Sequence, residues 1–332
     1  MGNPSGSRVA VTGASGFIGL QLVKRLRQDG FEVTAITRST AEQCISKAGE
    51  KWLHIKDPTD TRAWEDVIKN ADYVVHLAGL AHQIDKRTDE DQKQLYRVNI
   101  DTTAALANAV ASTRTVRRML FLSSVAAMGD FSENPLKETM ECSPNTEYGR
   151  SKLEAENCCK FLLSETVTDW CILRPPLVYG PGNPGNMGRL QRMLSARLPL
   201  PVGAFREKRS FVFVGNLVDL IVTSLKVPEA SRELFLVSDG HDISTADLIR
   251  LIADVQGVRV PIISVPKTLL EWMAKLLDFS MRLSGRNQNV FQYSLDRLNN
   301  PVLVDASKAR MLLGWSPPTS LEDGIRYTFG SK

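Results

Sequence analysis

The sequence contains no run of apolar residues long enough to cross a bilayer, so we do not expect an integral membrane protein. It also lacks a long run of neighbouring residues that all carry the same sign of charge. The 41 Lys and Arg and 37 Asp and Glu are spread along 332 residues and leave a formal net charge of +4. This even spread argues against a nucleic-acid-binding patch. Met1–Ser7 is polar and lacks the apolar core of a signal peptide.

Cysteine is sparse and follows no pattern. The five cysteines are Cys44, Cys142, Cys158, Cys159 and Cys171. Their number is odd, and neither a C-x-x-C pair nor a Cys/His spacing typical of a metal site occurs among them. We therefore expect free thiols in a reducing, cytoplasmic compartment and no metal site.

The first half of the sequence alternates short β-rich runs with helical stretches. The expected strands are Arg8–Thr12, Glu32–Thr37, Trp52–Ile55, Tyr73–Leu77, Met119–Ser123 and Trp170–Arg174. The expected helices are Phe17–Gln28, Thr61–Asn70, Glu90–Ser112 and Thr146–Ser164. Apolar runs of strand length that are spaced by helices are typical of a parallel sheet covered on both faces. With right-handed crossovers, this pattern predicts an α/β fold, a doubly wound Rossmann sheet.

The pattern changes after Arg174. Residues 175–188 hold four prolines and four glycines, so we expect a loop there. The strands expected beyond it are Ser210–Val214 and Leu234–Val237, and the helices are Thr245–Val255, Leu269–Leu283 and Leu321–Thr328. We predict a Rossmann domain over residues 7–175 and a smaller mixed α/β substrate lobe over residues 176–332, of which about 210–250 return to the sheet.

Residues 268–283 form an amphipathic pattern in which charged residues interrupt the apolar positions. A helix of this kind is more often packed on a protein surface than laid on a membrane. We therefore expect a packed helix, and we expect Trp272 with the apolar face around it to belong to the core.

Three glycines follow the first expected strand in a G-x-x-G-x-x-G pattern. The first allows a tight turn, the second lets the backbone approach a pyrophosphate, and the third allows close helix–sheet contact. The helix that starts there offers N–H donors to an anion. The pattern predicts nucleotide binding. The residues expected to contact the nucleotide are Gly13, Ser15, Gly16, Phe17, Ile18 and Gly19.

The end of the second strand bears on the kind of dinucleotide. A site that prefers NAD normally places Asp or Glu there, where it binds the ribose hydroxyls. Thr37 stands at this position, Arg38 follows it, and no carboxylate occurs before Glu42. Because a guanidinium suits a 2′-phosphate, we expect NADP(H) to be favoured over NAD(H).

Tyr148 is the only one of the six tyrosines with a lysine four residues later, Lys152. On a helix, positions i and i+4 share a face. A phenol has a pKa of about 10, and moving it to neutrality requires roughly 4 kcal/mol in favour of the phenolate. A lysine ammonium and an oxidised nicotinamide are charges of the right sign. Ser124, at the end of a preceding strand, is placed to hydrogen-bond a substrate oxygen while Tyr148 moves its proton.

Together these residues resemble the extended short-chain dehydrogenase/reductases, the nucleotide-sugar epimerase/dehydratase superfamily. The resemblance covers nearly the whole chain. Beyond the residues already named, the matching segments are Asp57-Pro58, His76-Leu77-Ala78-Gly79, Val98-Asn99, Leu173-Arg174-Pro175, Tyr179-Gly180-Pro181-Gly182, Arg209-Ser210-Phe211-Val212, Asp305-Ala306-Ser307-Lys308 and Leu313-Gly314-Trp315.

The resemblance implies roles for single residues. Ser124, Tyr148 and Lys152 would form the catalytic triad. Asn99 would support the lysine through water, and Arg209 would clamp the pyrophosphate of a nucleotide-sugar substrate. The further contacts to the cofactor would come from Asp57, Pro58, Leu77, Ala78, Gly79, Tyr148, Lys152 and Pro175. The substrate would be held by Ser124, Tyr148 and Arg209, and His82 either lines the sugar pocket or has no role.

Three reactions occur in this family. Dehydratases place an Asp-Glu pair directly after the catalytic Ser or Thr, and Val125 and Ala126 stand there instead, so we exclude 4,6-dehydration. Thr37-Arg38 favours a 4-ketoreductase over a 4-epimerase that retains NAD. So does the run from His76 to His82, which looks like bacterial reductases that act on UDP-4-keto-6-deoxy-N-acetylhexosamines for surface polysaccharide. Many epimerases also carry Asn in place of Leu177.

Other possibilities stay open. A UDP-sugar 4-epimerase acting on UDP-glucose or UDP-N-acetylglucosamine is the main alternative. A non-catalytic nucleotide sensor would usually lack the tyrosine or the lysine, and a steroid or flavonol reductase would have an apolar pocket rather than Arg209. Family members commonly dimerise through two long helices, here residues 90–112 and 146–164, so we expect a homodimer.

Overall fold

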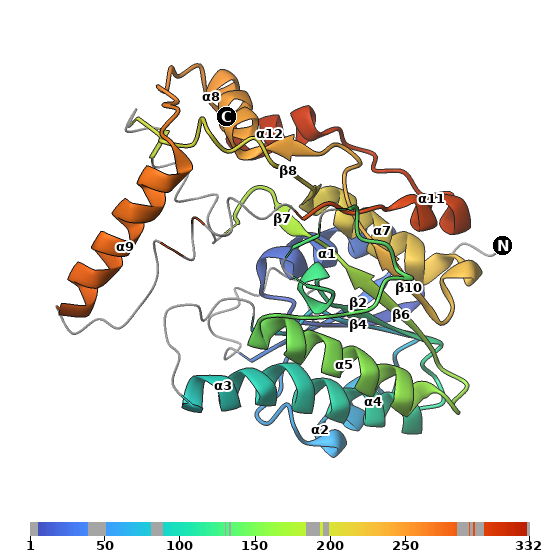
Figure 1. The fold of residues 1–332 in the computed structure, drawn as a ribbon. Coiled ribbons are helices and arrows are strands. Elements are labelled where there is room, and N and C mark those ends of the chain that lie inside the picture. The colour runs from blue at the N-terminus through green and yellow to red at the C-terminus, as the bar shows by residue number, and fades with distance from the viewer. Residues whose placement is uncertain are drawn as a thin grey trace.

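A seven-stranded sheet forms the centre of the computed structural model (Figure 1). The residues described are 6–38, 51–80, 89–129, 131–132, 134–183, 193–194, 199–283, 292, 295 and 302–330. The strands are β1 (Arg8–Thr12), β2 (Glu32–Thr37), β3 (Lys51–His54), β4 (Tyr73–His76), β5 (Arg118–Leu122), β6 (Asp169–Arg174) and β10 (Glu233–Leu236). They lie in the order β10-β6-β5-β4-β1-β2-β3, and all neighbours are parallel. The predicted doubly wound α/β fold is confirmed.

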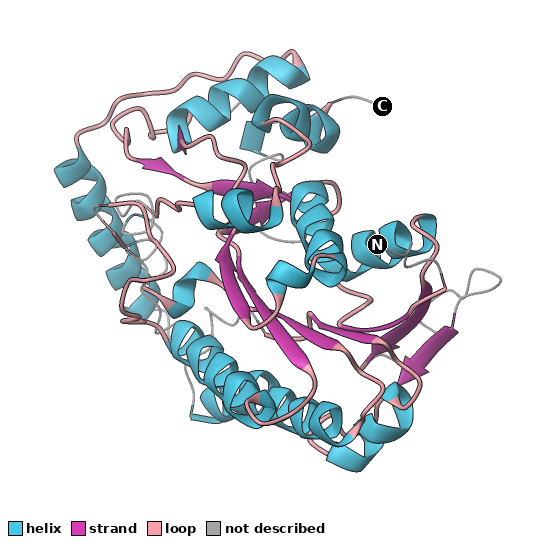
Figure 2. Ribbon diagram, turned by 90° about the vertical axis from the view of Figure 1, so that its right-hand side faces the viewer, coloured by secondary structure: helices cyan, strands magenta, loops and turns pink. Residues whose placement is uncertain are grey.

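Helices cover both faces of the sheet because successive apolar side chains of a strand point to opposite faces (Figure 2). In β1, Val9 and Val11 belong to a core shared with α1 and α7, whereas Ala10 belongs to a core shared with α2, α4 and α5. These helices are α1 (Phe17–Gln28), α2 (Thr61–Ile68), α4 (Thr102–Ser112), α5 (Glu147–Leu163) and α7 (Val214–Lys226). The helix expected over 90–112 is present as α3 (Asp89–Tyr96), a π-helical turn (Arg97–Asp101) and α4.

A smaller lobe lies above the sheet in Figure 1. Two short strand pairs lie in it: β7 (Leu177–Tyr179) is parallel to β9 (Phe211–Phe213), and β8 (Lys208–Arg209) is antiparallel to β11 (Ile243–Ser244). Its helices are α8 (Thr245–Gln256), α9 (Lys267–Leu283), α11 (Ser307–Leu313) and α12 (Leu321–Phe329). The expectation of a loop throughout 175–188 is wrong, because β7 lies within it. A three-residue strand has no readable period, and its partner lies far along the chain. The sequence reasoning also missed α7.

A buried polar cluster joins this lobe to the sheet. Asp239, which lies just beyond β10, accepts hydrogen bonds from the amide of Asn216 at 2.7 Å and from the hydroxyl of Tyr179 at 3.0 Å. The backbone N–H of Phe213 donates to the same carboxylate at 3.0 Å. Because a buried carboxylate needs partners, these bonds hold β7, β9 and α7 in one arrangement relative to β10.

The helix α9 packs on the protein by a different face from the one that we expected. Trp272 is 75% exposed, so its assignment to the core is wrong. The buried residues of α9 are Leu270, Ala274 and Asp278, which form a narrow inner edge. The helix packs through this edge, and its wider apolar face points away from the protein. Among the described residues, no helix is long and apolar enough to span a membrane.

The cysteines in the described stretches are free, as predicted. They are Cys142, Cys158, Cys159 and Cys171, and Cys44 lies outside the described residues. Burial raises the pKa of the Cys159 and Cys171 thiols to about 12, so these two side chains act as small apolar groups of the core.

Candidate active site

The turn between β1 and α1 fits the phosphates of a dinucleotide. Gly13 has a φ of +65°, and a Cβ there would lie 2.8 Å from the backbone nitrogen of Ala78. A Cβ on Gly19 would lie 2.2 Å from the carbonyl oxygen of Gly13, so both positions require glycine. Gly16 is exposed at the N-terminus of α1, and no side chain caps that end of the helix. The first N–H groups of α1 can therefore point at an anion.

A pocket of about 620 Å³ lies at the end of β2. Three cationic side chains line it: Arg38, Lys56 and Arg97. Asp57 and Pro58, expected at the adenine side, line it too. Hydrogen bonds from Thr59 and the charge of Arg97, 3.7 Å away, lower the pKa of the Asp57 carboxyl.

This pocket combines the predicted Arg38 with two cations that the sequence reasoning missed. Lys56 follows β3 and Arg97 lies in the π-helical turn, so no local motif connects them to Arg38. The neighbouring Thr37 is buried, and its hydroxyl lies 3.0 Å from that of Ser15 in the glycine loop. Because Thr37 directly precedes Arg38, the pocket lies next to the glycine turn. Asp57 and Asp60 also line it, so three cations face two carboxylates, and the net positive charge suits a phosphorylated ribose.

The side chains of Ser124 and Tyr148 meet beyond the end of β5. Ser124 caps a short 3₁₀ turn, and its hydroxyl accepts a hydrogen bond from the backbone N–H of Ala126 at 3.2 Å. The Ser124 hydroxyl lies close enough to the phenol of Tyr148 to act on its pKa. A Cβ on Gly149 would lie only 2.2 Å from the carbonyl oxygen of Ala126. Gly149, which the sequence reasoning missed, thus lets the start of α5 approach this turn.

Lys152 lies one helical turn beyond Tyr148 and is buried. Its ammonium donates to the carbonyl oxygen of Leu122 at 2.7 Å and lies 4.3 Å from the ring centre of Phe121. Burial lowers the pKa of Lys152 to about 8, against the opposing charge of Glu156. Burial raises the pKa of Tyr148, and the neighbouring hydroxyl of Ser124 opposes that shift. The phenol therefore keeps its proton at neutral pH, as a proton donor must.

Asn99 lies in the π-helical turn and is 1% exposed. Its amide donates to the hydroxyl of Ser151 at 2.9 Å and exchanges hydrogen bonds with the backbone of Leu80. A Cβ on Gly79 would lie 3.2 Å from the Asn99 side-chain oxygen and 3.7 Å from the ammonium of Lys152. Asn99 and Lys152 therefore border the same glycine, and support of the lysine through water stays a prediction. A π-helical turn of this kind often marks a functional site.

A chain of buried hydrogen bonds connects this turn to β1. The hydroxyl of Thr103 donates to the carbonyl oxygen of Asn99 at 2.7 Å, so it accepts from Nε2 of His76 at 3.0 Å. Nδ1 of His76 then accepts from the hydroxyl of Thr12 at 2.6 Å. Burial, followed by the charge of Lys152, lowers the pKa of His76 to about 3. The imidazole of His76 is therefore neutral, has one defined tautomer and stabilises the π-helical turn through these hydrogen bonds.

The other predicted cofactor contacts lie at strand ends. Residues 77–79 directly follow β4, where the N–H of Ala78 donates to the hydroxyl of Thr12 at 3.2 Å. Pro175 directly follows β6, and its carbonyl oxygen accepts from the N–H of Val125 at 3.0 Å. The structure therefore brings these segments to the glycine turn and to the Ser124 turn respectively.

A buried ion pair lies behind the candidate site. Glu156, one turn beyond Lys152, is fully buried, and Arg174 is 3% exposed. The guanidinium donates two hydrogen bonds to the carboxylate, at 2.8 and 2.6 Å. The hydroxyl of Ser123 donates to the same carboxylate. These bonds join α5 to the ends of β5 and β6, which carry the candidate residues.

Arg209 lies apart from these residues in sequence, on β8 of the smaller lobe, and is half-buried. His82 lies outside the described residues.

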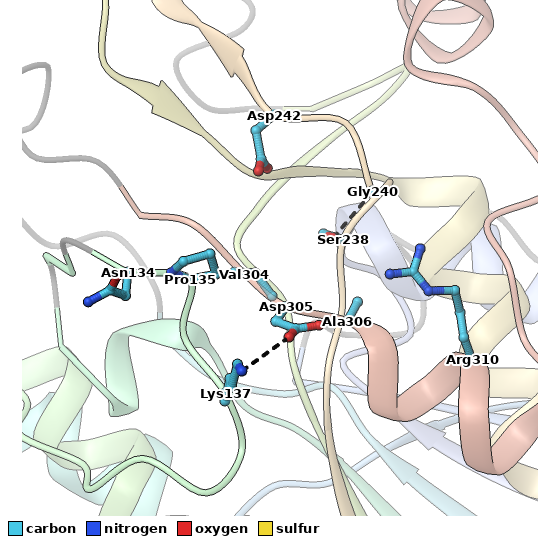
Figure 3. A pocket seen from close by; sticks show the side chains of 10 residues that line it. All are labelled: Asn134, Pro135, Lys137, Ser238, Gly240, Asp242, Val304, Asp305, Ala306 and Arg310. Atoms are coloured by element: carbon cyan, nitrogen blue, oxygen red, sulfur yellow. Dashed lines mark hydrogen bonds and ion pairs between the residues drawn. The ribbon is translucent and has the colours of Figure 1, made fainter.

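Figure 3 shows a second pocket, of about 470 Å³, near the end of β10. Arg310, Lys137 and Asp305 are among the residues that line it, and the last two form an ion pair at 4.0 Å. None of the candidate catalytic residues lines this pocket. In the described part of the chain, no group of three or more His, Cys, Asp or Glu could hold a metal.

Known proteins resemble the chain over nearly its full length. The family described as "NAD dependent epimerase/dehydratase family" matches residues 9–237. The UDP-glucose 4-epimerase of Vibrio cholerae is 34% identical, with 96% of this chain and 94% of that protein covered. The N-acetyl-alpha-D-glucosaminyl-diphospho-ditrans,octacis-undecaprenol 4-epimerase of Escherichia coli O157:H7 is 26% identical, with 96% and 93% covered.

Solved structures share the fold. The UDP-glucuronic acid 4-epimerase of Bacillus cereus, in complex with NAD, has a TM-score of 0.76 and 20% identity, with 97% of each chain covered. The sequence profile and the 34% identical relative carry the assignment, and the fold agrees with it. The chain is therefore an enzyme of the NAD dependent epimerase/dehydratase family.

Proposed function

We propose that this protein reduces the 4-keto group of a nucleotide sugar, a UDP-4-keto-6-deoxy-N-acetylhexosamine, with NADP(H) favoured as the cofactor. The observation that carries the reductive direction is the pocket lined by Arg38, Lys56 and Arg97, next to a strand end that holds Thr37 rather than an acid. An enzyme that consumes NADPH must bind and release it in each cycle, and cations that grip a 2′-phosphate serve that purpose.

The side chains near Ser124 supply the acid for this reaction. When bound, reduced nicotinamide provides a hydride for C4 of the sugar. Tyr148 gives its phenolic proton to the C4 oxygen, so that the C=O double bond becomes a CH–OH group. The ammonium of Lys152 stabilises the phenolate that forms, and Ser124 holds the same oxygen by a hydrogen bond. A proton from solvent then restores Tyr148. Val125 and Ala126 have no group that could remove a proton for a dehydration.

A second candidate is 4-epimerisation with retained NAD. The 34% identity to a protein named UDP-glucose 4-epimerase favours it. The two reactions share the hydride transfer at C4 and would use Ser124, Tyr148 and Lys152 in the same roles. In the epimerase the keto sugar rotates within the site and the cofactor stays bound. In the reductase the sugar does not rotate and the oxidised cofactor leaves.

A matched pair of assays distinguishes the two candidates. The first follows oxidation of NADPH and of NADH with UDP-4-keto-6-deoxy-N-acetylglucosamine, and the second follows conversion of UDP-N-acetylglucosamine or UDP-glucose without added reductant. We expect stoichiometric loss of NADPH in the first assay and no product in the second. Interconversion of the two 4-epimers without net use of cofactor would overturn the reductase and establish the epimerase.

Cofactor preference gives a separate prediction. The Arg38→Ser variant should lose about 10- to 100-fold in kcat/KM for NADPH, because a charge-assisted hydrogen bond contributes roughly 1.5–3 kcal/mol. The value for NADH should stay near that of the wild type. Steady-state kinetics with both cofactors measures this. Arg114→Ser removes an exposed arginine outside the pocket and serves as the control. Equal losses for NADPH and NADH would contradict the assignment of Arg38 to a 2′-phosphate.

A further inference from the structure

The helix α9 carries an exposed apolar face on the outside of the smaller lobe. In Figure 1 it extends along the edge of the molecule. Leu269, Trp272, Met273 and Leu276 follow the spacing i, i+3, i+4 and i+7, which places them on one side of the helix. The exposed apolar residues are Leu269 (51%), Trp272 (75%), Met273 (49%), Leu276 (68%), Leu277 (43%) and Phe279 (57%). We call these six residues the outer face of α9.

The outer face is held away from the protein. Leu270, Ala274 and Asp278 form the buried inner edge, and the carboxylate of Asp278 accepts a hydrogen bond from the backbone of Gln292 at 3.0 Å. At the start of the helix, Lys267 forms an ion pair with Glu207 at 2.5 Å. Glu207 lies two residues before Arg209, so α9 is attached to the segment that carries this proposed substrate contact. These contacts fix which side of α9 faces solvent.

The distribution of charge suits an anionic partner. Of the two acidic residues of α9, Glu271 is half-buried and Asp278 is buried, so neither lies on the outer face. Lys275 is exposed beside that face. An amphipathic helix with Trp, Phe and Leu on one side and a lysine beside them can lie in the interface of a bilayer, where anionic headgroups attract that lysine.

The outer face presents a continuous apolar area on a single helix. Large apolar side chains each bring roughly 150–250 Å², so six of them at these exposures present on the order of 600 Å². A face of this size on one helix is well matched to insertion among lipid headgroups, which needs only one face of one helix.

We propose that α9 docks the protein on an anionic lipid surface, with its outer face inserted between the headgroups. The helix then lies in the plane of the interface, and the smaller lobe faces the membrane. This docking is separate from the reaction proposed above, because no residue of the outer face belongs to the candidate active site.

Sedimentation with vesicles tests this docking. The full-length protein is mixed with vesicles of equal parts phosphatidylcholine and phosphatidylglycerol, or of phosphatidylcholine alone, and the bound fraction is measured. We expect binding to the anionic vesicles. The double variant Trp272→Gln/Leu276→Gln should lose at least about tenfold in partition coefficient, since both side chains would leave the lipid. Lys275→Gln should lose about fivefold on anionic vesicles and little on neutral ones.

A matched control uses exposed apolar residues elsewhere. Met311 (76% exposed) and Val167 (82%) lie outside α9, and the Met311→Gln/Val167→Gln variant should bind vesicles as the wild type does. All variants should unfold at the wild-type temperature, because the changed side chains are exposed. A wild-type protein that stays in the supernatant would overturn the docking. So would undiminished binding of Trp272→Gln/Leu276→Gln, or a dimer in solution that this variant converts to a monomer without any vesicle binding.

Discussion

The Tyr148→Phe variant should reduce the keto sugar about 10²- to 10⁴-fold more slowly than the wild type, the range that a positioned proton donor contributes. The phenylalanine ring fills the same space, but the C4 oxygen then receives no proton from this position. Ser124 and Lys152 remain, and we expect neither to replace the phenol: the Ser124 hydroxyl is a far weaker acid, and the Lys152 ammonium is held at the carbonyl oxygen of Leu122, away from the position of the phenolic proton. Single-turnover measurement of NADPH oxidation gives the rate of the chemical step.

Two controls keep this result specific to chemistry. NADPH affinity, measured by fluorescence titration, should fall far less than the rate in Tyr148→Phe, because Tyr148 is only one of the expected cofactor contacts and the phosphates are assigned to the glycine turn after β1. Tyr327→Phe removes another phenol, one that is 68% exposed on α12, and should leave the rate unaltered. A Tyr148→Phe variant that retains the wild-type rate would refute the role proposed for Tyr148 in either reaction at C4.

The second large effect concerns stability. Glu156→Gln should lower the free energy of unfolding by about 3–5 kcal/mol, the usual consequence of removing one partner of a buried ion pair. The amide keeps nearly the same shape but leaves the charge of Arg174 without its counterion in a buried place. Denaturation by urea, followed by circular dichroism, measures the change.

An exposed ion pair provides the comparison for Glu156. Asp66 and Lys69 lie 3.7 Å apart with 85% and 65% of their side chains exposed. Asp66→Asn should therefore change the free energy of unfolding by at most about 1 kcal/mol. The double variant Glu156→Leu/Arg174→Met should be more stable than Glu156→Gln, since it leaves no unpaired charge. If Glu156→Gln cost no more than Asp66→Asn, the buried pair would not hold α5 against the sheet as described.

Much of the fold could be predicted because its elements carry local signals. The central strands β1, β4 and β5 are mainly apolar runs, and nearly all of their residues are buried, as expected for strands covered on both faces. The glycine pattern predicts its own turn, because Gly13 needs a positive φ and Gly19 has no room for a Cβ. Prediction failed for β7, whose three residues pair with β9 more than thirty positions later. It failed for Trp272 because an amphipathic pattern does not say which way the helix faces.

The residues of the candidate site also include some that a local pattern predicts and others that no local pattern predicts. Tyr148 and Lys152 are one helical turn apart, so their common face follows from spacing alone. Gly149 was missed although it adjoins Tyr148, because its importance lies in the carbonyl oxygen of Ala126 that approaches it from another segment. Lys56 and Arg97 were missed because they reach the pocket of Arg38 from β3 and from the π-helical turn.

The sequence by itself determined the order of strands and helices in the first half of the chain, the glycine turn after β1, the Tyr148–Lys152 pair and the family, because each of these depends on residues close together in the chain. Only the tertiary structure decided which distant side chains became neighbours. It brought Ser124 to Tyr148, enclosed the Glu156–Arg174 pair, connected His76 to the turn of Asn99 and pointed the apolar face of α9 outward. These arrangements depend on how whole elements pack, and packing is set by the summed burial of many residues rather than by any local pattern.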